Sequence, residues 1–319
     1  MTVQRPASDP VRPRREPWLM IDGVLLLDKP AGLSSNAALQ RARRAVRAEH
    51  AGHTGTLDPL ASGLLPLVFG DAAKFGQSML DADKEYLAHV RLGARTSTGD
   101  AEGEIVEVAS VPPHDREALE CALAAFRGEI SQVPPMHSAL KQGGVPLYKM
   151  ARQGIEVARA ARVVQILELE LLSLDLPDLV LRVRCSKGTY IRTLAEDIGR
   201  AMGSQAHLQG LRRTGVGAFR IEAAVGLEAL EAMEASARVS RLLPPDAPLA
   251  ALPRVDLDTA SAQRLRHGQS ARLISAAGVQ GLARAYRPAG DFLGVVEARG
   301  GELRVVRLVR ERSAAPGEG

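Results

Sequence analysis

A single carboxylate stands in a segment made mostly of small and apolar residues. Residues 52–66 read GHTGTLDPLASGLLP, and Asp58 is the only acidic residue among them. An exposed turn would explain the glycines and the proline, although such turns usually carry more charge. A buried strand would explain the leucines but not the aspartate. Asp58 is therefore a candidate for chemistry.

A second segment offers a cation in an unfavourable place. Residues 185–193 read CSKGTYIRT and put Tyr190 and Arg192 at the start of a predicted helix. The helix dipole disfavours a cation in the first turn by roughly a few tenths of a kcal/mol or more. A nearby anion would offset this, and Asp58 and Asp100 are the candidates. The pattern fits a reactive site and an ordinary loop-stabilising ion pair equally well.

The segments around these residues predict an α+β fold, because strands and helices interleave without a regular βαβ rhythm. Apolar residues alternate in EYLAHVRL, residues 85–92, as in a strand with one buried face. After Tyr190 they recur at helical spacing. Strands are predicted for residues 23–27, 85–92, 105–111, 163–175 and 179–186. Helices are predicted for residues 34–48, 116–130 (with Gly128 near the C-terminal end) and about 190–202.

The net charge of +4 is unevenly distributed along the 319 residues. Residues 141–220 hold 13 Lys and Arg against 7 Asp and Glu, whereas residues 1–140 carry a net −3 and residues 221–319 a net +1. This basic block predicts either a binding surface for a polyanion or a solvated basic face. Because aromatic residues are only 3% of the chain, a nucleic-acid target would be a shaped one rather than a loose strand.

Composition argues against several other classes of protein. No apolar run approaches the ~18 residues that span a bilayer, and the N-terminus lacks the apolar core of a secretory signal. Cys121 and Cys185 are isolated, which fits a reducing, cytoplasmic compartment and excludes a thiolate zinc site. His50 and His53 have no further ligands nearby in sequence, so we expect no metal there.

Four motifs, in order and at the same spacing, resemble bacterial tRNA pseudouridine synthases of the TruB family. They are LLLDKPAGLSSNAALQRARR, AGHTGTLDPLASGLLPLVFGDAAKF, KEYLAHVRLGARTSTGDAEG and CSKGTYIRTLAEDIG. The resemblance is dense over residues 20–230. It implies an α+β catalytic domain with a mixed, mainly antiparallel sheet flanked by helices, followed by a small β-rich, PUA-like domain.

The resemblance also implies an activity. A uridine in the tRNA T loop, position 55, would be isomerised to pseudouridine without any cofactor, and Asp58 would act as the nucleophile on a flipped-out nucleotide. Attack at C1′ of the ribose or at C6 of the base stays open. Glycine neighbours would give Asp58 the clearance that this approach needs. The expected partner is the tRNA T stem-loop, bound by a monomer without a guide RNA, an obligatory protein partner or a membrane.

The family's charged network maps onto Asp58, Asp100 and Arg192. The guanidinium of Arg192 would hold Asp58 ionised, as a nucleophilic carboxylate must be. Tyr86 corresponds to the tyrosine that stacks on the target base and takes part in proton transfer. The alternative for Tyr86 is an aromatic residue packed in the core of a strand.

Four further residues match substrate-binding or structural positions of the family. His53 corresponds to the histidine that fills the gap left by the extruded uridine, Tyr190 to a second tyrosine that contacts substrate, and Leu211 to a leucine that closes on the base. Each could instead be a plain structural residue, and Leu211 most of all. Lys29 is expected to order the floor of the site without a catalytic role.

The resemblance and the composition together predict a division of the chain. We expect a disordered basic tail at residues 1–18, a catalytic domain at 19–245 with an RNA-binding thumb insertion at 131–160, a linker at 246–253, a PUA-like RNA-binding domain at 254–312 and a tail at 313–319. In the C-terminal domain, short strands are predicted for residues 264–273, 282–287, 291–298 and 303–309.

Three other functions fit part of the pattern. A tRNA-binding chaperone of the same fold would share the basic block but would not need Asp58, Arg192 and Tyr86. A guide-dependent synthase would share the catalytic core but not the bacterial thumb. A two-carboxylate glycosidase would need a general acid, and Asp100 beside Arg192 would instead stay ionised.

Overall fold

The computed structural model describes residues 17–272 and 278–311. The predicted tails at 1–18 and 313–319 therefore lie almost entirely outside the described residues. Within the described ranges, no helix combines the length and the apolar character that crossing a bilayer requires.

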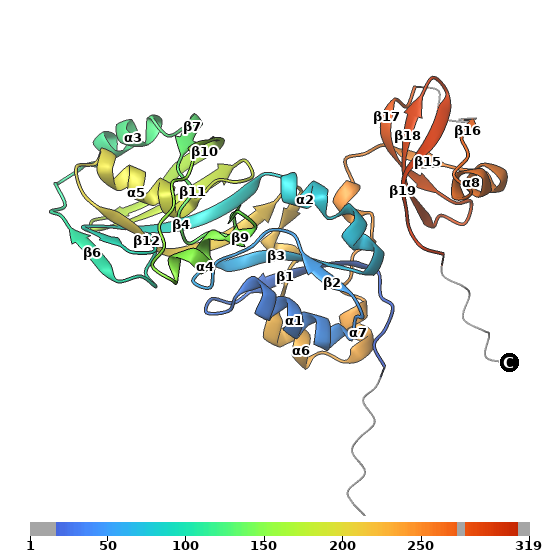
Figure 1. The fold of residues 1–319 in the computed structure, drawn as a ribbon, viewed down its shortest axis with the longest axis horizontal. Coiled ribbons are helices and arrows are strands. Elements are labelled where there is room, and N and C mark those ends of the chain that lie inside the picture. Colours follow the sequence, from blue (N-terminus) through green and yellow to red (C-terminus); the bar gives the residue numbers. More distant parts are fainter. Residues whose placement is uncertain (1–16, 273–277, 312–319) are drawn as a thin grey trace, which may run out of the picture.

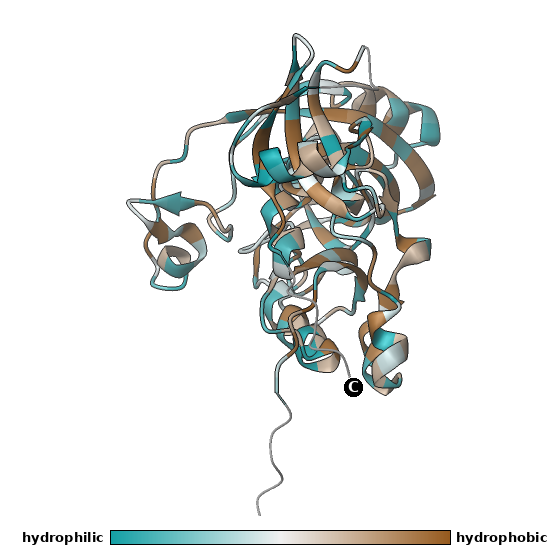
Figure 2. Ribbon diagram, turned by 90° about the vertical axis from the view of Figure 1, so that its right-hand side faces the viewer, coloured by the Kyte–Doolittle hydropathy of each residue, from teal (hydrophilic) through white to brown (hydrophobic). Residues whose placement is uncertain are grey.

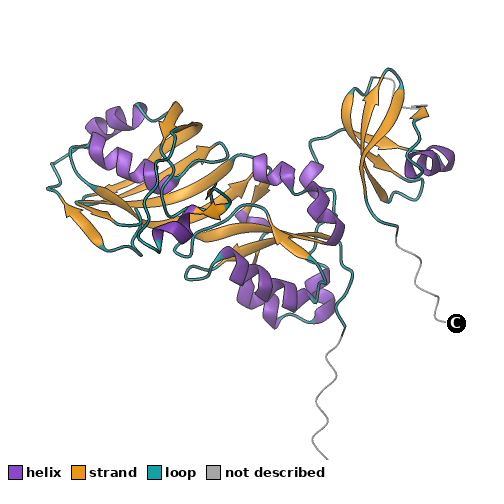
Figure 3. Ribbon diagram, in the orientation of Figure 1, coloured by secondary structure: helices purple, strands orange, loops and turns teal. Residues whose placement is uncertain are grey.

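One large mixed sheet forms most of the molecule and confirms the predicted fold class (Figures 1 and 3). Its strands lie in the order β14-β1-β3-β12-β4-β11-β10-β7, and only the β1–β14 and β3–β12 contacts on this path are parallel. The short strands β2 and β13 pair with β3 and β12. The bounds are β1 Gly23–Lys29, β2 Ala51–His53, β3 Ser62–Phe69, β4 Lys84–Leu92, β7 Gly128–Gln132, β10 Arg162–Asp175, β11 Asp178–Cys185, β12 Ala206–Val216, β13 Phe219–Arg220 and β14 Val225–Gly226.

Helices and short hairpins cover this sheet. The helix α1 packs with α6 and α7 beside β1 and β3, and α5 lies over β12 (Figure 1). The helical bounds are α1 Ser35–Val46, α2 Gln77–Asp81, α3 Arg116–Ala124, α4 Leu147–Ala151, α5 Ile191–Ala201, α6 Leu227–Ala232, α7 Ala235–Val239 and α8 Thr259–Arg266, with 3₁₀ turns η1 Gly70–Phe75, η2 Ile221–Ala223 and η3 Ala247–Leu249. Two hairpins are β5 Ala94–Thr96 with β6 Ile105–Val108, and β8 Lys141–Gln142 with β9 Val145–Pro146.

Two of the apolar cores that pack on the large sheet meet in its centre. One core lies between α5, α3 and the strands β4, β10, β11 and β12. The other lies between α1, α6 and the strands β1 and β3. Tyr86 on β4 and Leu211 on β12 pack against both cores, so these two side chains mark the seam. The hydrophobic colouring of the sheet strands in Figure 2 follows this burial.

Strand β3 is buried on both faces, which fixes the segment that follows Asp58. Leu65, Leu67 and Phe69 face the α1 side, whereas Leu64 and Val68 face a separate cluster on the other side. A strand covered on both faces reads as a continuous apolar run, and LLPLVF is such a run.

Two sequence-based boundaries were wrong for identifiable reasons. The helix predicted for 116–130 ends at Ala124, because Gly128 adopts φ +87° and opens β7 instead. The strand predicted for 264–273 is, in its described part, the end of α8 followed by β16 Ala271–Arg272. Asp258 starts α8, where its side chain accepts a hydrogen bond from the Ser261 N–H at 2.6 Å.

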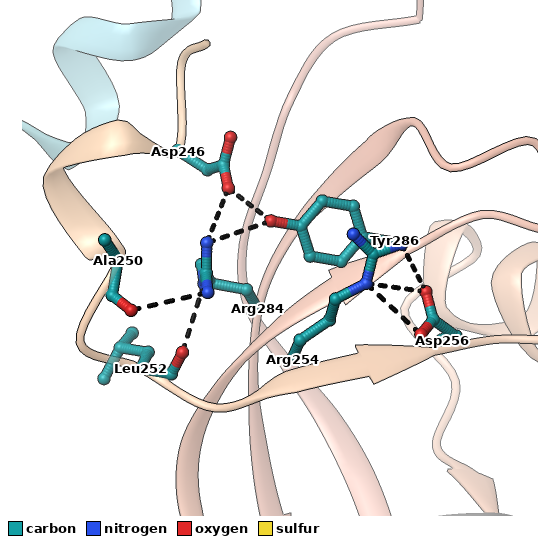
Figure 4. Close-up of polar contacts among 7 residues, drawn as sticks. All are labelled: Asp246, Ala250, Leu252, Arg254, Asp256, Arg284 and Tyr286. Carbon is teal, nitrogen blue, oxygen red and sulfur yellow. Dashed lines mark hydrogen bonds and ion pairs between the residues drawn. The ribbon is translucent and has the colours of Figure 1, made fainter. Parts of the chain in front are cut away.

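The C-terminal part forms a separate five-stranded sheet, in the order β15-β17-β18-β19-β16. Its remaining strands are β15 Arg254–Asp256, β17 Gly281–Tyr286, β18 Phe292–Arg299 and β19 Glu302–Leu308. This β-rich architecture agrees with the sequence-based prediction. Figure 4 shows how the preceding segment is tied to it: Asp246 pairs with Arg284 at 3.0 Å and accepts a hydrogen bond from the Tyr286 hydroxyl. The guanidinium of Arg254 stacks 3.9 Å from the centre of the Tyr286 ring.

The C-terminal sheet also contacts the large sheet directly, at the end of β3. The rings of Phe75 and Phe292 lie edge to face with centroids 5.3 Å apart. Lys74 Nζ donates to the Leu308 carbonyl at 3.0 Å, and buried Asp71 accepts a hydrogen bond from the Arg310 N–H. All three contacts come from η1, so this turn joins the C-terminal sheet to the part of the molecule built on the large sheet.

We predict that Gly63→Ala will strongly destabilise the fold. Gly63 has φ +103°, and a Cβ atom there would lie 2.3 Å from the carbonyl oxygen of Arg213 on the neighbouring strand. The clash is with backbone, so the β3–β12 contact must open, and a loss of about 2 kcal/mol or more in the free energy of unfolding is expected. Urea unfolding will measure it.

Gly226→Ala is the matched control in the same sheet. It lies in β14, has no left-handed φ, and a Cβ there would meet nothing within 4 Å. Equal unfolding midpoints for the two variants would contradict the role assigned to Gly63.

Candidate active site

Asp58 lies in the loop between β2 and β3, and this loop is clamped from two sides. The Ser35 hydroxyl, in the first turn of α1, donates to the Leu57 carbonyl at 2.9 Å and accepts from the Leu57 N–H at 2.7 Å. From the other side, Arg213 Nη2 donates to the Gly55 carbonyl at 3.3 Å. These contacts hold the backbone on both sides of the acid, which fixes where its carboxylate can point.

Arg192, in the first turn of α5, joins this loop to two other segments. One of its terminal nitrogens lies 3.0 Å from Asp58 Oδ2, and its Nε lies 3.7 Å from Asp100 Oδ2. Its remaining donors reach the carbonyls of Thr98 and His137 at 2.9 and 2.6 Å. The side chain is only 7% exposed. The structure thus brings Arg192 together with both acids named from the sequence.

Asp100 is the more buried of the two acids and is held by its own hairpin. Its carboxylate accepts hydrogen bonds from the Thr98 hydroxyl at 2.6 Å and from the Glu102 N–H at 3.2 Å. The side chain is 5% exposed, against 39% for Asp58. Asp100 is therefore placed to orient the guanidinium, whereas Asp58 is the acid that another molecule can reach.

The electrostatics of Asp58 combine opposing effects. The neighbouring guanidinium favours the ionised carboxyl, as expected from the sequence. Burial instead raises the pKa of Asp58 above its ordinary value, and the charge of Asp100 acts in the same direction. Arg192 opposes both effects without cancelling them. The ion pair thus limits the upward shift rather than reversing it.

A cavity of about 270 Å³ opens beside Asp58, close to the roughly 300 Å³ at the lower end of ligand pockets. Four of the other sequence-predicted residues line it together with Asp58: Tyr86, Tyr190, Arg192 and Leu211. Burial raises the pKa of both tyrosines, so both phenols are neutral at ordinary pH.

His53 lies elsewhere, in a neighbouring cavity of about 650 Å³. Asp58 and Arg192 are among the six residues that line both cavities, so they lie on the border that the two cavities share. Burial and the charge of Arg213 lower the pKa of His53, and its Nδ1 is buried without a hydrogen-bond partner. Tyr148 and Arg152 of α4 and its C-terminal end border this second cavity.

Lys29 is fully buried and bonded to backbone. Its Nζ donates to the carbonyls of Pro30 and Leu33 at 2.9 and 2.6 Å, and burial lowers its pKa to about 8. These contacts fix the turn that leads into α1, in keeping with the structural role expected from the sequence.

Sequence reasoning missed three residues at the site. Gln132 on β7 is 2% exposed and brackets the Tyr190 backbone, accepting from its N–H at 3.0 Å and donating to its carbonyl at 3.3 Å. Lys84 and Arg213 line the first cavity although both are buried. The Arg-Arg pair in LQGLRRTG was the available signal for Arg213, since alternation along a strand turns one of two adjacent arginines inward.

Three family models match consecutive parts of the chain. Residues 43–191 match the N-terminal domain of TruB family pseudouridylate synthases, residues 192–250 the tRNA pseudouridylate synthase B C-terminal domain, and residues 253–309 the C-terminal domain of pseudouridine synthase II TruB.

Curated relatives and solved structures agree with these models. Proteins named tRNA pseudouridine synthase B are 56% identical in Cupriavidus metallidurans (95% of this chain, 99% of the relative) and 59% identical in Burkholderia lata (84% and 83%). Cbf5 in a Cbf5-Nop10-Gar1 complex matches with a TM-score of 0.68 at 26% identity, over 90% of this chain and 84% of that one. The chain belongs to the TruB family of pseudouridylate synthases.

Proposed function

We propose that this protein isomerises uridine 55 in the T loop of tRNA to pseudouridine, with Asp58 as the nucleophile and no cofactor. Family membership and relatives named tRNA pseudouridine synthase B support the reaction and the substrate. The observation that carries the site is geometric. A reachable carboxylate, 3.0 Å from a buried guanidinium, lines a cavity with two tyrosines and a leucine.

The reaction needs one group that can bond to the nucleotide and then leave. The Asp58 carboxylate would add either to C1′ of the ribose, displacing N1 of the base with the electron pair of the C1′–N1 bond, or to C6 of the base, after which the C1′–N1 bond breaks. In both routes the detached base turns while it is held, C5 bonds to C1′, the C5 proton is lost and the carboxylate is released. Arg192 would keep the carboxylate directed into the cavity throughout.

Tyr86 and Leu211 are proposed to hold the base. They stand on adjacent strands, at the seam where the two apolar cores meet. A flat ring inserted there would contact apolar surface from both sides, and Tyr190 lines the same cavity. Extruding a nucleotide costs roughly a few kcal/mol, and this contact would offset part of that cost.

His53 is proposed to take the place of the extruded base in the RNA. Its separate cavity suits this role, because a residue that fills the gap in the RNA must lie apart from the pocket that receives the base. Asp58 and Arg192 lie on the border that the two cavities share.

The wider tRNA surface is proposed to involve the predicted thumb and the C-terminal sheet. Residues 131–160 contain the hairpin β8–β9 and α4, and Arg152 reaches the cavity of His53. We further propose a division into residues 19–245 for catalysis, 246–253 as a linker and 254–312 as a PUA-like RNA-binding domain. The enzyme would act on tRNA as a monomer, without a guide RNA or an obligatory protein partner.

Tritium release from tRNA labelled at C5 of uridine tests the function directly. The purified chain with an unmodified tRNA transcript, and no other RNA or protein, should release one tritium per tRNA. A transcript with cytidine at position 55 should release none. Tight tRNA binding without release would instead favour the chaperone function.

Asp58→Asn should abolish tritium release, by about 10⁴-fold or more, because the amide cannot act as the nucleophile. The dissociation constant for tRNA should change less than about threefold, since the variant keeps the size of the side chain. Asp28→Asn is the matched control: Asp28 also pairs with an arginine, Arg212 at 2.7 Å, but does not line either cavity. Turnover by Asp58→Asn at the wild-type rate would refute the assignment.

Arg192→Lys should lower single-turnover rates by about 100-fold or more. A lysine ammonium cannot reach Asp58, Asp100 and two backbone carbonyls at once, as the planar guanidinium does. Arg212→Lys, which alters a more exposed arginine–aspartate pair, should have a far smaller effect. Equal rate losses in the two variants would show that Arg192 acts only through stability.

The acid limb of kcat/KM should lie above the pH expected of an ordinary aspartate, because the pKa of Asp58 is raised. Activity needs the ionised form, so it is present above this pKa and is lost as the pH falls through it. Asp100→Asn removes a neighbouring negative charge and should move the limb to lower pH, whatever it does to the maximal rate. A shift to higher pH would contradict this account.

A further inference from the structure

Two buried cations line the Asp58 cavity and have no part in the chemistry described so far. Lys84 is the first residue of β4 and is 8% exposed, and Arg213 on β12 is 1% exposed. Both side chains line the same cavity as Asp58, Tyr86 and Tyr190.

Neither cation is paired with an acid. Within residues 17–272 and 278–311, no carboxylate oxygen lies within 4.0 Å of either side-chain charge. Lys84 Nζ donates to the carbonyls of Leu80 and Ala82, both at 2.7 Å, and to that of Met79 at 3.3 Å. Arg213 Nε donates to the Leu64 carbonyl at 2.7 Å. These bonds satisfy the donors but leave both positive charges uncompensated.

Arg213 also acts on two residues of the proposed mechanism. It lies directly opposite Tyr86 across the β4–β12 pair, and its Nη2 donates to the Gly55 carbonyl in the loop that carries Asp58. The adjacent Arg212 differs, because it forms a two-pronged pair with Asp28. Of these two adjacent arginines, Arg213 lines the cavity and Arg212 carries the acid.

Keeping these charges buried is unfavourable for the folded protein. Burial and, after it, the charge of Arg213 together lower the pKa of Lys84 to about 8. The other titratable groups that face Lys84 are Cys185 on β11, Asp81 at the end of α2 and Asp83 next to it, and all three act weakly in the opposite direction. Neutral donors could form the same hydrogen bonds to these carbonyls, so the hydrogen bonds do not explain why the residues are charged. A negative group that enters the cavity would explain it.

The proposed reaction supplies such a group, and the inference rests on that proposed function. If the carboxylate attacks C1′, the C1′–N1 bond breaks and its electron pair leaves with the uracil, spread over N1, O2 and O4. If the carboxylate attacks C6, the electrons of the C5–C6 bond move towards C5 and O4. Either route puts negative charge on the ring while it lies in the cavity.

We propose that Lys84 and Arg213 form a positive floor under the base, which stabilises the negative charge that develops on uracil during the reaction. The floor acts before the C5 proton is lost and is independent of which carbon Asp58 attacks. Preorganised charge of this kind lowers a barrier because it needs no rearrangement when the transition state forms.

Lys84 is the residue to test, because changing Arg213 would also disturb Gly55 and Tyr86. Lys84→Met keeps the length of the side chain and removes the charge, whereas Lys84→Arg keeps the charge at every accessible pH. Both variants need thermal unfolding and tRNA affinity measured alongside activity. The readout is kcat/KM for tritium release from pH 6.5 to 9.0, since this parameter reports groups of the free enzyme.

Three results are expected. Wild-type kcat/KM should fall as the pH rises through about 8, where Lys84 loses its proton. Lys84→Met should be about 10- to 100-fold slower at pH 7, with tRNA affinity within about twofold, and should lack this alkaline limb. Lys84→Arg should have most of the wild-type activity, and its kcat/KM should stay constant to beyond pH 9.

Lys29 is the matched titrating control, because burial also lowers its pKa to about 8. Lys29→Arg should leave the alkaline limb in place. If Lys29→Arg moves the limb and Lys84→Arg does not, the proposal is overturned. It is also overturned if Lys84→Met retains activity within about twofold of wild type. If Lys84→Met does not fold, the position of the alkaline limb of kcat/KM in Lys84→Arg is enough to test the proposal.

The same assay separates this inference from the function on which it rests. A wild-type chain that releases no tritium from tRNA would overturn the proposed function itself. An active wild type whose rate and pH profile do not depend on Lys84 would overturn only the positive floor.

Discussion

The contact between Arg192 and Asp58 is the constraint on which the rest of the site depends. It joins a loop near the start of the chain to the first turn of a helix more than a hundred residues later. The guanidinium is almost fully buried, whereas the carboxylate is reachable. Because burial of the acid works against its ionisation, the cation has to be held rigidly, and Asp100 with two backbone carbonyls holds it.

The fold meets this constraint by placing the site where two apolar cores join. The α1 side fixes the loop of Asp58 through Ser35 and Leu57, and the α5 side fixes Arg192. Tyr86 and Leu211 belong to both cores, so the surface that would hold a base forms only when the two halves of the sheet are assembled. The strands β4 and β12 therefore contribute both to the proposed site and to the stability of the fold.

The family and the acid–arginine network could be predicted from the sequence, because every motif that carries them is a short run of residues. The helix that begins near Arg192 was predicted from apolar residues at helical spacing. Asp58 was singled out because small residues surround it. What could not be predicted depended on tertiary contacts. The net direction of the Asp58 pKa follows from burial, the end of the helix before Gly128 follows from pairing with β10, and the inward turn of Lys84 and Arg213 follows from sheet register.

Strand β3 has a mechanical consequence. Asp58 precedes one end of it, and η1, which grips the C-terminal sheet, follows directly from the other. Eight extended residues span about 26 Å at ~3.3 Å each. The strand therefore sets much of the distance between the loop of the acid and the second sheet. Under the proposed function, an RNA bound at both places would have to span that distance, so the shape of the RNA would count in addition to its sequence.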